Sequence, residues 1–218
     1  MFFKQKKRKI YCFVGLPGSG KGTQIDILAK EKDATVIGIG KIAREAIDGK
    51  FDLDKSLVEE IRKNYDIGEP QEDEIVFKLI KSKLGRAKHK NLIFDNFPFS
   101  KHQAKLLDEF VIENKFEKPI VIYINILPKT AIERLKIRKL CSKCGATTSD
   151  TVLDICPKCG GKLENREDDN TKTVENRIRF YTPRIKEILE LYPNHFNIDG
   201  EGSIENIAQN IKKSLNEK

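Results

Sequence analysis

The sequence predicts an α/β protein in which a central parallel sheet of five strands is covered by helices on both faces. Short apolar runs without polar alternation recur along the chain, and such runs are typical of strands buried on both sides. Helical segments separate these runs, and an alternation of strand and helix predicts a three-layer fold. The 218 residues, of which 39% are hydrophobic, suit one such domain with insertions.

Most of the expected strands are short apolar runs bounded by a turn or a polar residue. The five runs are 10–14, 35–39, 91–95, 118–127 and 196–199. The run over 118–127 is the longest, and we expect it in the central region of the sheet.

Helices are predicted where apolar residues recur every three or four positions. The segments are 23–30, 41–47, 53–65, 72–84, 100–114, 129–139, 168–192 and 204–215. Pro183 is expected to bend or interrupt the helix over 168–192, because proline cannot donate a backbone hydrogen bond.

The composition favours a soluble protein that handles anionic ligands. The formal net charge of +8 suits nucleotides as well as nucleic acid, although lysine-rich solvated helices would produce the same excess by themselves. No apolar stretch approaches the ~20 residues that span a bilayer, and the N-terminus lacks a signal-peptide pattern. We therefore expect a cytoplasmic monomer with no membrane or nucleic-acid partner.

A glycine-rich loop over residues 15–23, Gly-Leu-Pro-Gly-Ser-Gly-Lys-Gly-Thr, joins the first predicted strand to the first predicted helix. This context is typical of a P-loop, because the glycines let successive N–H groups turn toward phosphate oxygens at a helix N-terminus. Lys21 is expected to reach the β- and γ-phosphates. A glycine-rich turn without a ligand is the disfavoured alternative. The residues expected to bind ATP are Gly15, Pro17, Gly18, Ser19, Gly20, Lys21, Gly22 and Thr23.

A carboxylate and a set of arginines extend this prediction. Asp95 ends the third predicted strand, where it could orient Mg²⁺ through water. Phosphoryl transfer needs positioned cations more than acid–base groups. Arg134 and Arg138 are four residues apart on one predicted helix and should share a face. Arg166 and Arg177 follow the cysteine-rich stretch.

Four cysteines form two C-x-x-C pairs that are separated by eleven residues: Cys141, Cys144, Cys156 and Cys159. A glycine follows each pair and allows a tight turn around an ion. Four thiolates make a closed tetrahedral site, so the spacing predicts structural Zn²⁺. Disulfides are disfavoured in a reducing compartment, and four free thiols would leave the paired spacing unexplained.

Four motifs carry a resemblance to a known family. The glycine-rich loop continues to Gln24, and Asp95-Asn-Phe-Pro98 is similar to an Asp-Gly-Phe-Pro-Arg signature. Arg166-Glu-Asp-Asp169, followed by Thr173-Val174 and Arg177, is similar to an Arg-x-Asp-Asp…Thr-Val…Arg signature. Glu133-Arg-Leu-x-x-Arg138 matches a helix that enters a lid. Over about residues 9–216, the chain resembles the adenylate kinase family of nucleoside monophosphate kinases, in its zinc-lid type.

The resemblance implies the reaction MgATP + AMP ⇌ 2 ADP in one P-loop domain with two inserted parts. The core would comprise residues 1–37, 71–138 and 167–218, the helical AMP-binding segment 38–70 and the zinc lid 139–166.

The resemblance also implies the roles of individual residues. The implied catalytic residues are Lys21, Arg138, Arg166 and Arg177, and Arg134 and Arg138 would also bind ATP. The implied AMP-binding residues are Gly40, Lys41, Arg44, Gln71, Asn96, Gln103, Arg166 and Arg177. Asp168 and Asp169 would latch the closed lid.

The acceptor side departs from the family's pattern. Ile39-Gly40-Lys41 stands where the family has Thr-Gly-Asp, Asn96 replaces a glycine, and Phe99 replaces the arginine that grips the acceptor phosphate. Phenylalanine cannot form a bidentate anion clamp. We favour the interpretation that Lys41 supplies the missing charge and that AMP is still accepted. Alternatively, AMP binds weakly, the acceptor is CMP, UMP or GMP, or the chain binds nucleotides with weak or no kinase activity.

Overall fold

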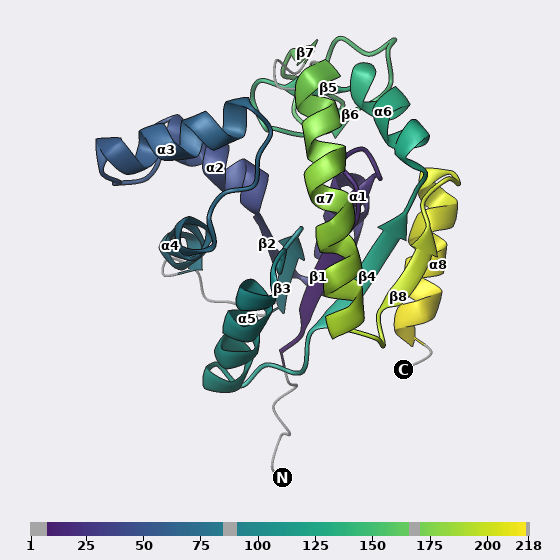
Figure 1. Cartoon of the computed structure of the whole chain (residues 1–218). Helices are drawn as coiled ribbons and strands as arrows, with labels where there is room; N and C mark the ends of the chain where they lie inside the picture. The colour runs from purple at the N-terminus through teal and green to yellow at the C-terminus, as the bar shows by residue number, and fades with distance from the viewer. Residues whose placement is uncertain (1–7, 85–90, 166–170, 217–218) are drawn as a thin grey trace.

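The computed structural model describes residues 8–84, 91–165 and 171–216 (Figure 1). A central sheet of five parallel strands confirms the predicted fold class. The strands lie in the order β2 (Ala34–Gly38), β3 (Asn91–Asp95), β1 (Ile10–Val14), β4 (Ile120–Asn125) and β8 (Phe196–Asp199). The central strand is β1, so the longest apolar run is one place away from the centre. A long apolar run indicates that a strand is buried on both faces of the sheet. This holds for β4 although it is not the central strand, because it lies between β1 and β8.

Helices cover both faces of the sheet. In the described parts of the chain they are α1 (Lys21–Lys32), α2 (Ile39–Ile47), α3 (Lys55–Asp66), α4 (Asp73–Leu84), α5 (Lys101–Glu113), α6 (Pro128–Lys136), α7 (Thr171–Leu191) and α8 (Ile204–Asn216). Alternate side chains of β1 point to opposite faces. Tyr11 and Phe13 share a core with α1 and α8, whereas Ile10, Cys12 and Val14 share one with α2, α4, α5 and α7 (Figure 1).

Several element bounds differ from the predicted ones. The strand predicted over 35–39 ends at Gly38, because Ile39 already begins α2. The strand predicted over 118–127 shortens to β4, since Pro119 lacks an N–H for the ladder and Pro128 opens α6. The helix predicted over 129–139 ends at Lys136, so Arg138 does not share a helix with Arg134.

The sequence predicted that Pro183 bends or interrupts the long helix, and the interruption does not occur. Pro183 lies inside α7, which is continuous from Thr171 to Leu191. The missing hydrogen bond would have gone to the carbonyl of Arg179, and both Arg179 and Pro183 are exposed. Water can therefore replace the lost partner, and the helix continues.

The cysteine-rich stretch forms a small antiparallel sheet of its own. Its strands lie in the order β6 (Thr147–Thr148), β5 (Lys139–Cys141) and β7 (Leu163–Asn165). The buried residues of this sheet and its loops are Cys141, Cys156 and Leu163, which is little apolar material for an independent core. Among the described helices of the whole chain, none is long and apolar enough to cross a membrane.

Candidate active site

The glycine-rich loop turns between β1 and α1 in a conformation that side chains would block. A Cβ at Gly15 would lie 2.6 Å from the carbonyl oxygen of Ile124, and one at Gly18 would lie 2.8 Å from that of Ala131. Gly18 also has a φ of +86°, which L-residues rarely adopt. No side chain caps the N-terminus of α1, so its first N–H groups can bind phosphate oxygens.

Lys21 is the first residue of α1, and its side chain is buried within the loop. The Nζ atom donates hydrogen bonds to the carbonyl oxygens of Gly15 at 2.9 Å and Leu16 at 2.8 Å, and to Ser19 Oγ at 3.2 Å. Burial lowers the pKa of Lys21 to about 8; the Asp95 carboxylate opposes this shift and the Arg138 guanidinium adds to it. The structure thus brings Lys21 and Asp95 together with Arg138, although Arg138 lies beyond the end of α6.

One cavity of about 600 Å³ collects most of the described residues that the sequence singled out. This volume lies in the range of small-molecule sites. The predicted residues that line it are Pro17, Gly18, Gly20, Lys21, Gly22, Thr23, Gly40, Lys41, Arg44, Gln71, Asp95, Asn96, Gln103, Arg138 and Arg177.

Apart from the cysteines, three described residues that the sequence predicted for the site are not among those that line this cavity, and three more lie outside the described residues. Gly15 and Ser19 are buried within the phosphate loop. Arg134 instead donates from Nη2 to the carbonyl oxygen of Gly200 at 3.0 Å. The remaining three, Arg166, Asp168 and Asp169, lie outside the described residues.

Asn96 follows β3, where the resembling signature has glycine. Its φ of 53° is left-handed, a conformation that asparagine tolerates better than most residues. Its N–H donates to the carbonyl oxygen of Phe13 at 2.8 Å, which ties the end of β3 to β1. Its side-chain Oδ1 is buried without a hydrogen-bond partner among the described residues. The exchange of glycine for asparagine therefore preserves the backbone and adds a polar atom to the cavity wall.

Two glutamines that the resemblance assigns to AMP binding are held by neighbouring groups. Gln103 Oε1 accepts from the N–H of Phe99 at 2.8 Å, and its Nε2 donates to Asp73 Oδ1 at 2.7 Å. Gln71 Nε2 donates to the carbonyl oxygen of Ile61 at 2.9 Å. Both side chains are buried, so their amide orientations are fixed before any ligand binds.

Phe99 is packed as an aromatic residue and leaves no cation at its position. Its ring centre lies 4.4 Å from that of Tyr181, and the guanidinium carbon of Arg184 lies 5.3 Å from the Phe99 ring centre. Phe99 and Tyr181 line the cavity, whereas Arg184 does not. Lys41, an exposed cation in the first turn of α2, lines the same cavity.

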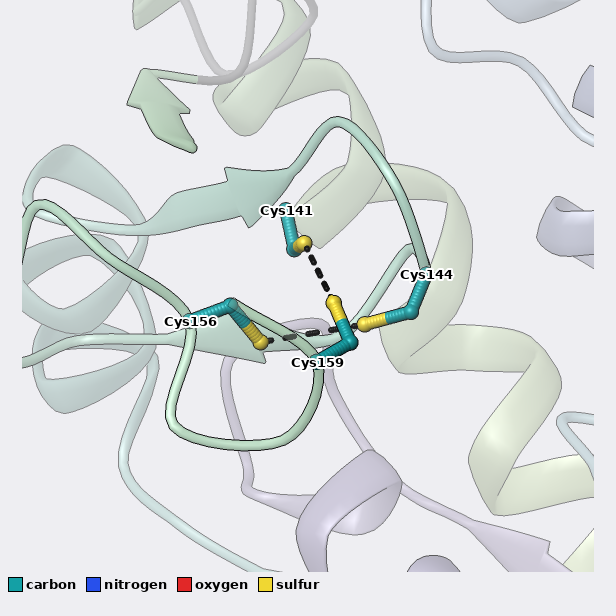
Figure 2. Close-up of side chains that lie close together, drawn as sticks. All are labelled: Cys141, Cys144, Cys156 and Cys159. Atoms are coloured by element: carbon teal, nitrogen blue, oxygen red, sulfur yellow. Dashed lines mark hydrogen bonds between the residues drawn. The ribbon is translucent and has the colours of Figure 1, made fainter. Parts of the chain in front are cut away.

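The four cysteines gather as their spacing predicted (Figure 2). The sulfur atoms of Cys141 and Cys159 lie 3.4 Å apart, those of Cys144 and Cys156 lie 3.7 Å apart, and all four lie within 4.8 Å of one another. Zn–S bonds of about 2.3 Å in a tetrahedron place sulfur atoms about 3.8 Å apart, so the cluster fits this ion. A hydrogen bond from the backbone N–H of Cys144 lowers the pKa of the Cys141 thiol to about 6. A backbone hydrogen bond from Gly161 lowers the pKa of Cys159, but the neighbouring thiols outweigh it and raise that pKa to about 12, so one thiolate of the cluster is favoured before an ion binds.

Two lysines hold the cysteine hairpin, residues 139–165, in place: one bonds within the hairpin and the other bonds the core. Lys139 Nζ donates to the carbonyl oxygens of Thr151 at 3.0 Å and Leu153 at 2.9 Å, and so fixes the long loop. Lys158, between the second pair of cysteines, forms an ion pair of 2.9 Å with Asp26 on α1. No local sequence pattern indicates this contact, because the two residues are 132 positions apart. Both Asp26 and Lys158 line the cavity.

Fold and cavity together define the class of this protein: it is a P-loop phosphotransferase. A family model described as "Adenylate kinase" matches residues 13–197. The chain is 34% identical over 215 residues to an "Adenylate kinase" of Thermoanaerobacter sp., an alignment that covers 94% of this chain and 97% of that protein. It is 36% identical over 208 residues to an "Adenylate kinase" of Staphylococcus epidermidis, with 91% and 94% covered. It is 31% identical over 215 residues to an "Adenylate kinase" of Methanocella arvoryzae, with 94% and 97% covered. The chain belongs to the adenylate kinase family, and its activity is that of a nucleoside monophosphate kinase.

Proposed function

We propose that this chain transfers the γ-phosphoryl group of MgATP to AMP, which yields two molecules of ADP. One observation carries the proposal: a single cavity joins the phosphate loop to Arg44, Gln103 and Arg177. Donor and acceptor that share one cavity need only be aligned, because phosphoryl transfer depends on positioning and charge stabilisation more than on acid–base chemistry.

On the donor side, the N–H groups of the phosphate loop and Lys21 would hold the β- and γ-phosphates. Mg²⁺ that arrives with ATP neutralises phosphate charge, and Asp95 would orient it through water. Arg138, Arg166 and Arg177 would surround the transferring group, and Arg134 would contact the donor nucleotide.

The acceptor base would be read by Gln103. With one bond made by each end of its amide, Oε1 can accept one more hydrogen bond and Nε2 can donate one more. Adenine offers a donor beside an acceptor, which matches this pair, whereas guanine offers two acceptors on the corresponding edge. The chemistry of Gln103 therefore favours AMP over GMP.

The acceptor phosphate would lie near Arg44, with Lys41 as the cation that offsets Phe99. Both lysine and arginine attract a phosphate, but lysine does so as a point charge and not as a planar fork. Lys41 and Arg44 are three residues apart on α2 and line the same cavity, so both can reach one ligand.

The cysteine hairpin would act as a lid that is shaped by structural zinc bound to Cys141, Cys144, Cys156 and Cys159. A closed lid excludes water, which would otherwise accept the phosphoryl group. Asp168 and Asp169 would help to latch it.

An acceptor screen tests the proposal. Rates with AMP, CMP, UMP and GMP are measured at saturating MgATP, for the wild type and for Lys41→Asp. We expect the highest kcat/KM with AMP and a decrease of about fivefold or more in Lys41→Asp, because an attractive charge becomes repulsive. Lys105→Asp on the exposed face of α5 makes the same charge change away from the cavity and should leave kcat/KM unchanged.

Two results would contradict parts of this proposal. A higher kcat/KM with another monophosphate would show that this nucleotide, and not AMP, is the preferred acceptor. ATP binding without turnover on any monophosphate would favour a nucleotide-binding protein without kinase activity.

A further inference from the structure

A tyrosine that the motifs do not mark contacts the cation of the acceptor side. Tyr65 lies in the last turn of α3, and its hydroxyl accepts a hydrogen bond of 3.0 Å from Arg44 Nη1 on α2. The guanidinium carbon of Arg44 lies 6.0 Å from the centre of the Tyr65 ring, within the range of a cation–π interaction. Tyr65 and Arg44 line the same cavity.

The position of Tyr65 is in turn set by α7. The carbonyl oxygen of Asp66 accepts from Thr173 Oγ1 at 3.4 Å, and that of Ile67 accepts from Asn176 Nδ2 at 3.1 Å. Gly68 packs so closely that a Cβ there would lie 2.8 Å from Thr173 Cγ2. The end of α3 is therefore docked on the helix that carries Arg177.

The guanidinium of Arg44 lies beside the cavity in an orientation that the protein itself determines. A Cβ at Gly40 would lie 3.9 Å from Arg44 Nη1, which places this nitrogen over the first turn of α2. Arginine has five N–H donors, so one bond to Tyr65 leaves a fork for a phosphate. A flexible side chain that is held in place loses less conformational freedom when its ligand binds.

We propose that Tyr65 is a positioning residue for the acceptor phosphate, because its hydroxyl holds the Arg44 guanidinium toward the cavity. This inference rests on the proposed function, in which Arg44 binds that phosphate. Phe99 makes the orientation of Arg44 more important, since no cation stands at position 99 to share the phosphate. Tyr65 acts through Arg44 and has no part in the transfer of the phosphoryl group.

A double-mutant cycle tests the inference. Steady-state rates are measured for the wild type, Tyr65→Phe, Arg44→Ala and the double variant, with AMP varied at saturating MgATP and then with MgATP varied at saturating AMP. Tyr65→Phe keeps the ring and removes only the hydroxyl. We expect it to raise the KM for AMP about fivefold, with kcat and the KM for ATP within about twofold of the wild type.

The double variant separates positioning from a structural role. If Tyr65 acts through Arg44, Tyr65→Phe should not lower kcat/KM for AMP further in the Arg44→Ala background. The slope of rate against AMP concentration gives this value even without saturation. Tyr123→Phe is the matched control, because it removes a hydroxyl that bonds Asn125 Oδ1 at 2.9 Å outside the cavity.

The outcomes are distinct. An unchanged KM for AMP in Tyr65→Phe, an equal rise in the KM for ATP, or the same loss in the Arg44→Ala background would each overturn the positioning role. A wild type that phosphorylates no monophosphate would overturn the proposed function, and this inference with it.

Discussion

ATP binding should weaken as the pH rises from 7 to 9, because the central cation of the donor site loses its proton in this range. The Lys21 side chain is only 6% exposed, and burial lowers its pKa to about 8 from the ordinary 10.5. About 90% of empty sites then carry a charged Lys21 at pH 7, and about 10% at pH 9. The triphosphate prefers the charged form, so its apparent affinity should fall about tenfold over this interval.

The same shift predicts how Lys21 affects folding. The difference between a pKa of about 8 in the folded chain and 10.5 in the unfolded chain corresponds to about 3 kcal/mol. The folded pKa is depressed, so the unfolded state binds more protons between these values. The contribution of Lys21 to stability is therefore least favourable below pH 8 and improves as the pH rises toward 10.5. The phosphate loop is thus a place where the fold gives up stability for binding.

Calorimetric titration with a non-hydrolysable ATP analogue, without acceptor, measures the effect at pH 7, 8 and 9. Lys21→Arg is the control, because arginine keeps its charge throughout this range. Its affinity should be lower at pH 7 but should not change with pH. A wild-type dissociation constant that stays constant from pH 7 to pH 9, or a Lys21→Arg variant with the same slope, would refute the reasoning.

Three further substitutions test other parts of the site. Arg138→Ala should lower kcat about a hundredfold or more, because a cation proposed to stabilise the charge of the transferring phosphoryl group is lost, while the thermal midpoint stays within a few degrees; a near-normal turnover would contradict its role. Cys156→Ser should abolish the single equivalent of zinc that metal analysis should find in the wild type and should lower the thermal midpoint; a fully active wild type without metal would contradict this. Lys158→Ala should raise the KM for ATP by up to about fivefold at low salt, since an exposed ion pair contributes about 0.2–1 kcal/mol; an equal effect at high salt would show that the ion pair is not the cause.

The parts of the fold that depend on local pattern were predictable from the sequence. The strands over 10–14, 91–95 and 196–199 have the predicted bounds, and the first two are short apolar runs that end at a turn. One error arose where a local signal competes with the packing of the whole helix. Pro183 forbids one hydrogen bond, but the packing of α7 against the core outweighs that loss, and solvent replaces the partner.

In the candidate site, too, the features formed by neighbouring residues were predictable, and the contacts between distant elements were not. The phosphate loop and the cysteine pairs are read from neighbouring residues, so their geometry follows from the sequence. Tyr65 and the pair of Lys158 with Asp26 depend on how distant elements pack, and nothing in the local sequence marks them. Arg138 was singled out by its motif, although the reason given for its position, a helical face shared with Arg134, was wrong.

The difference between a site formed by one local loop and a site formed by distant elements also explains why the departures from the family pattern lie on the proposed acceptor side. The donor phosphates are to be held by backbone N–H groups in a loop that side chains would block, so few substitutions are possible there. The acceptor phosphate is to be held by side chains from separate elements, and charge can move from one to another. Relative to the family's pattern, Phe99 removes one positive charge and Lys41 in place of Asp changes the charge by two in the positive direction. On the proposal that Lys41 offsets Phe99, attraction for a phosphate is retained while the geometric selection of a bidentate arginine is lost. Orientation of the acceptor would then depend chiefly on Arg44 and on Tyr65, which holds it.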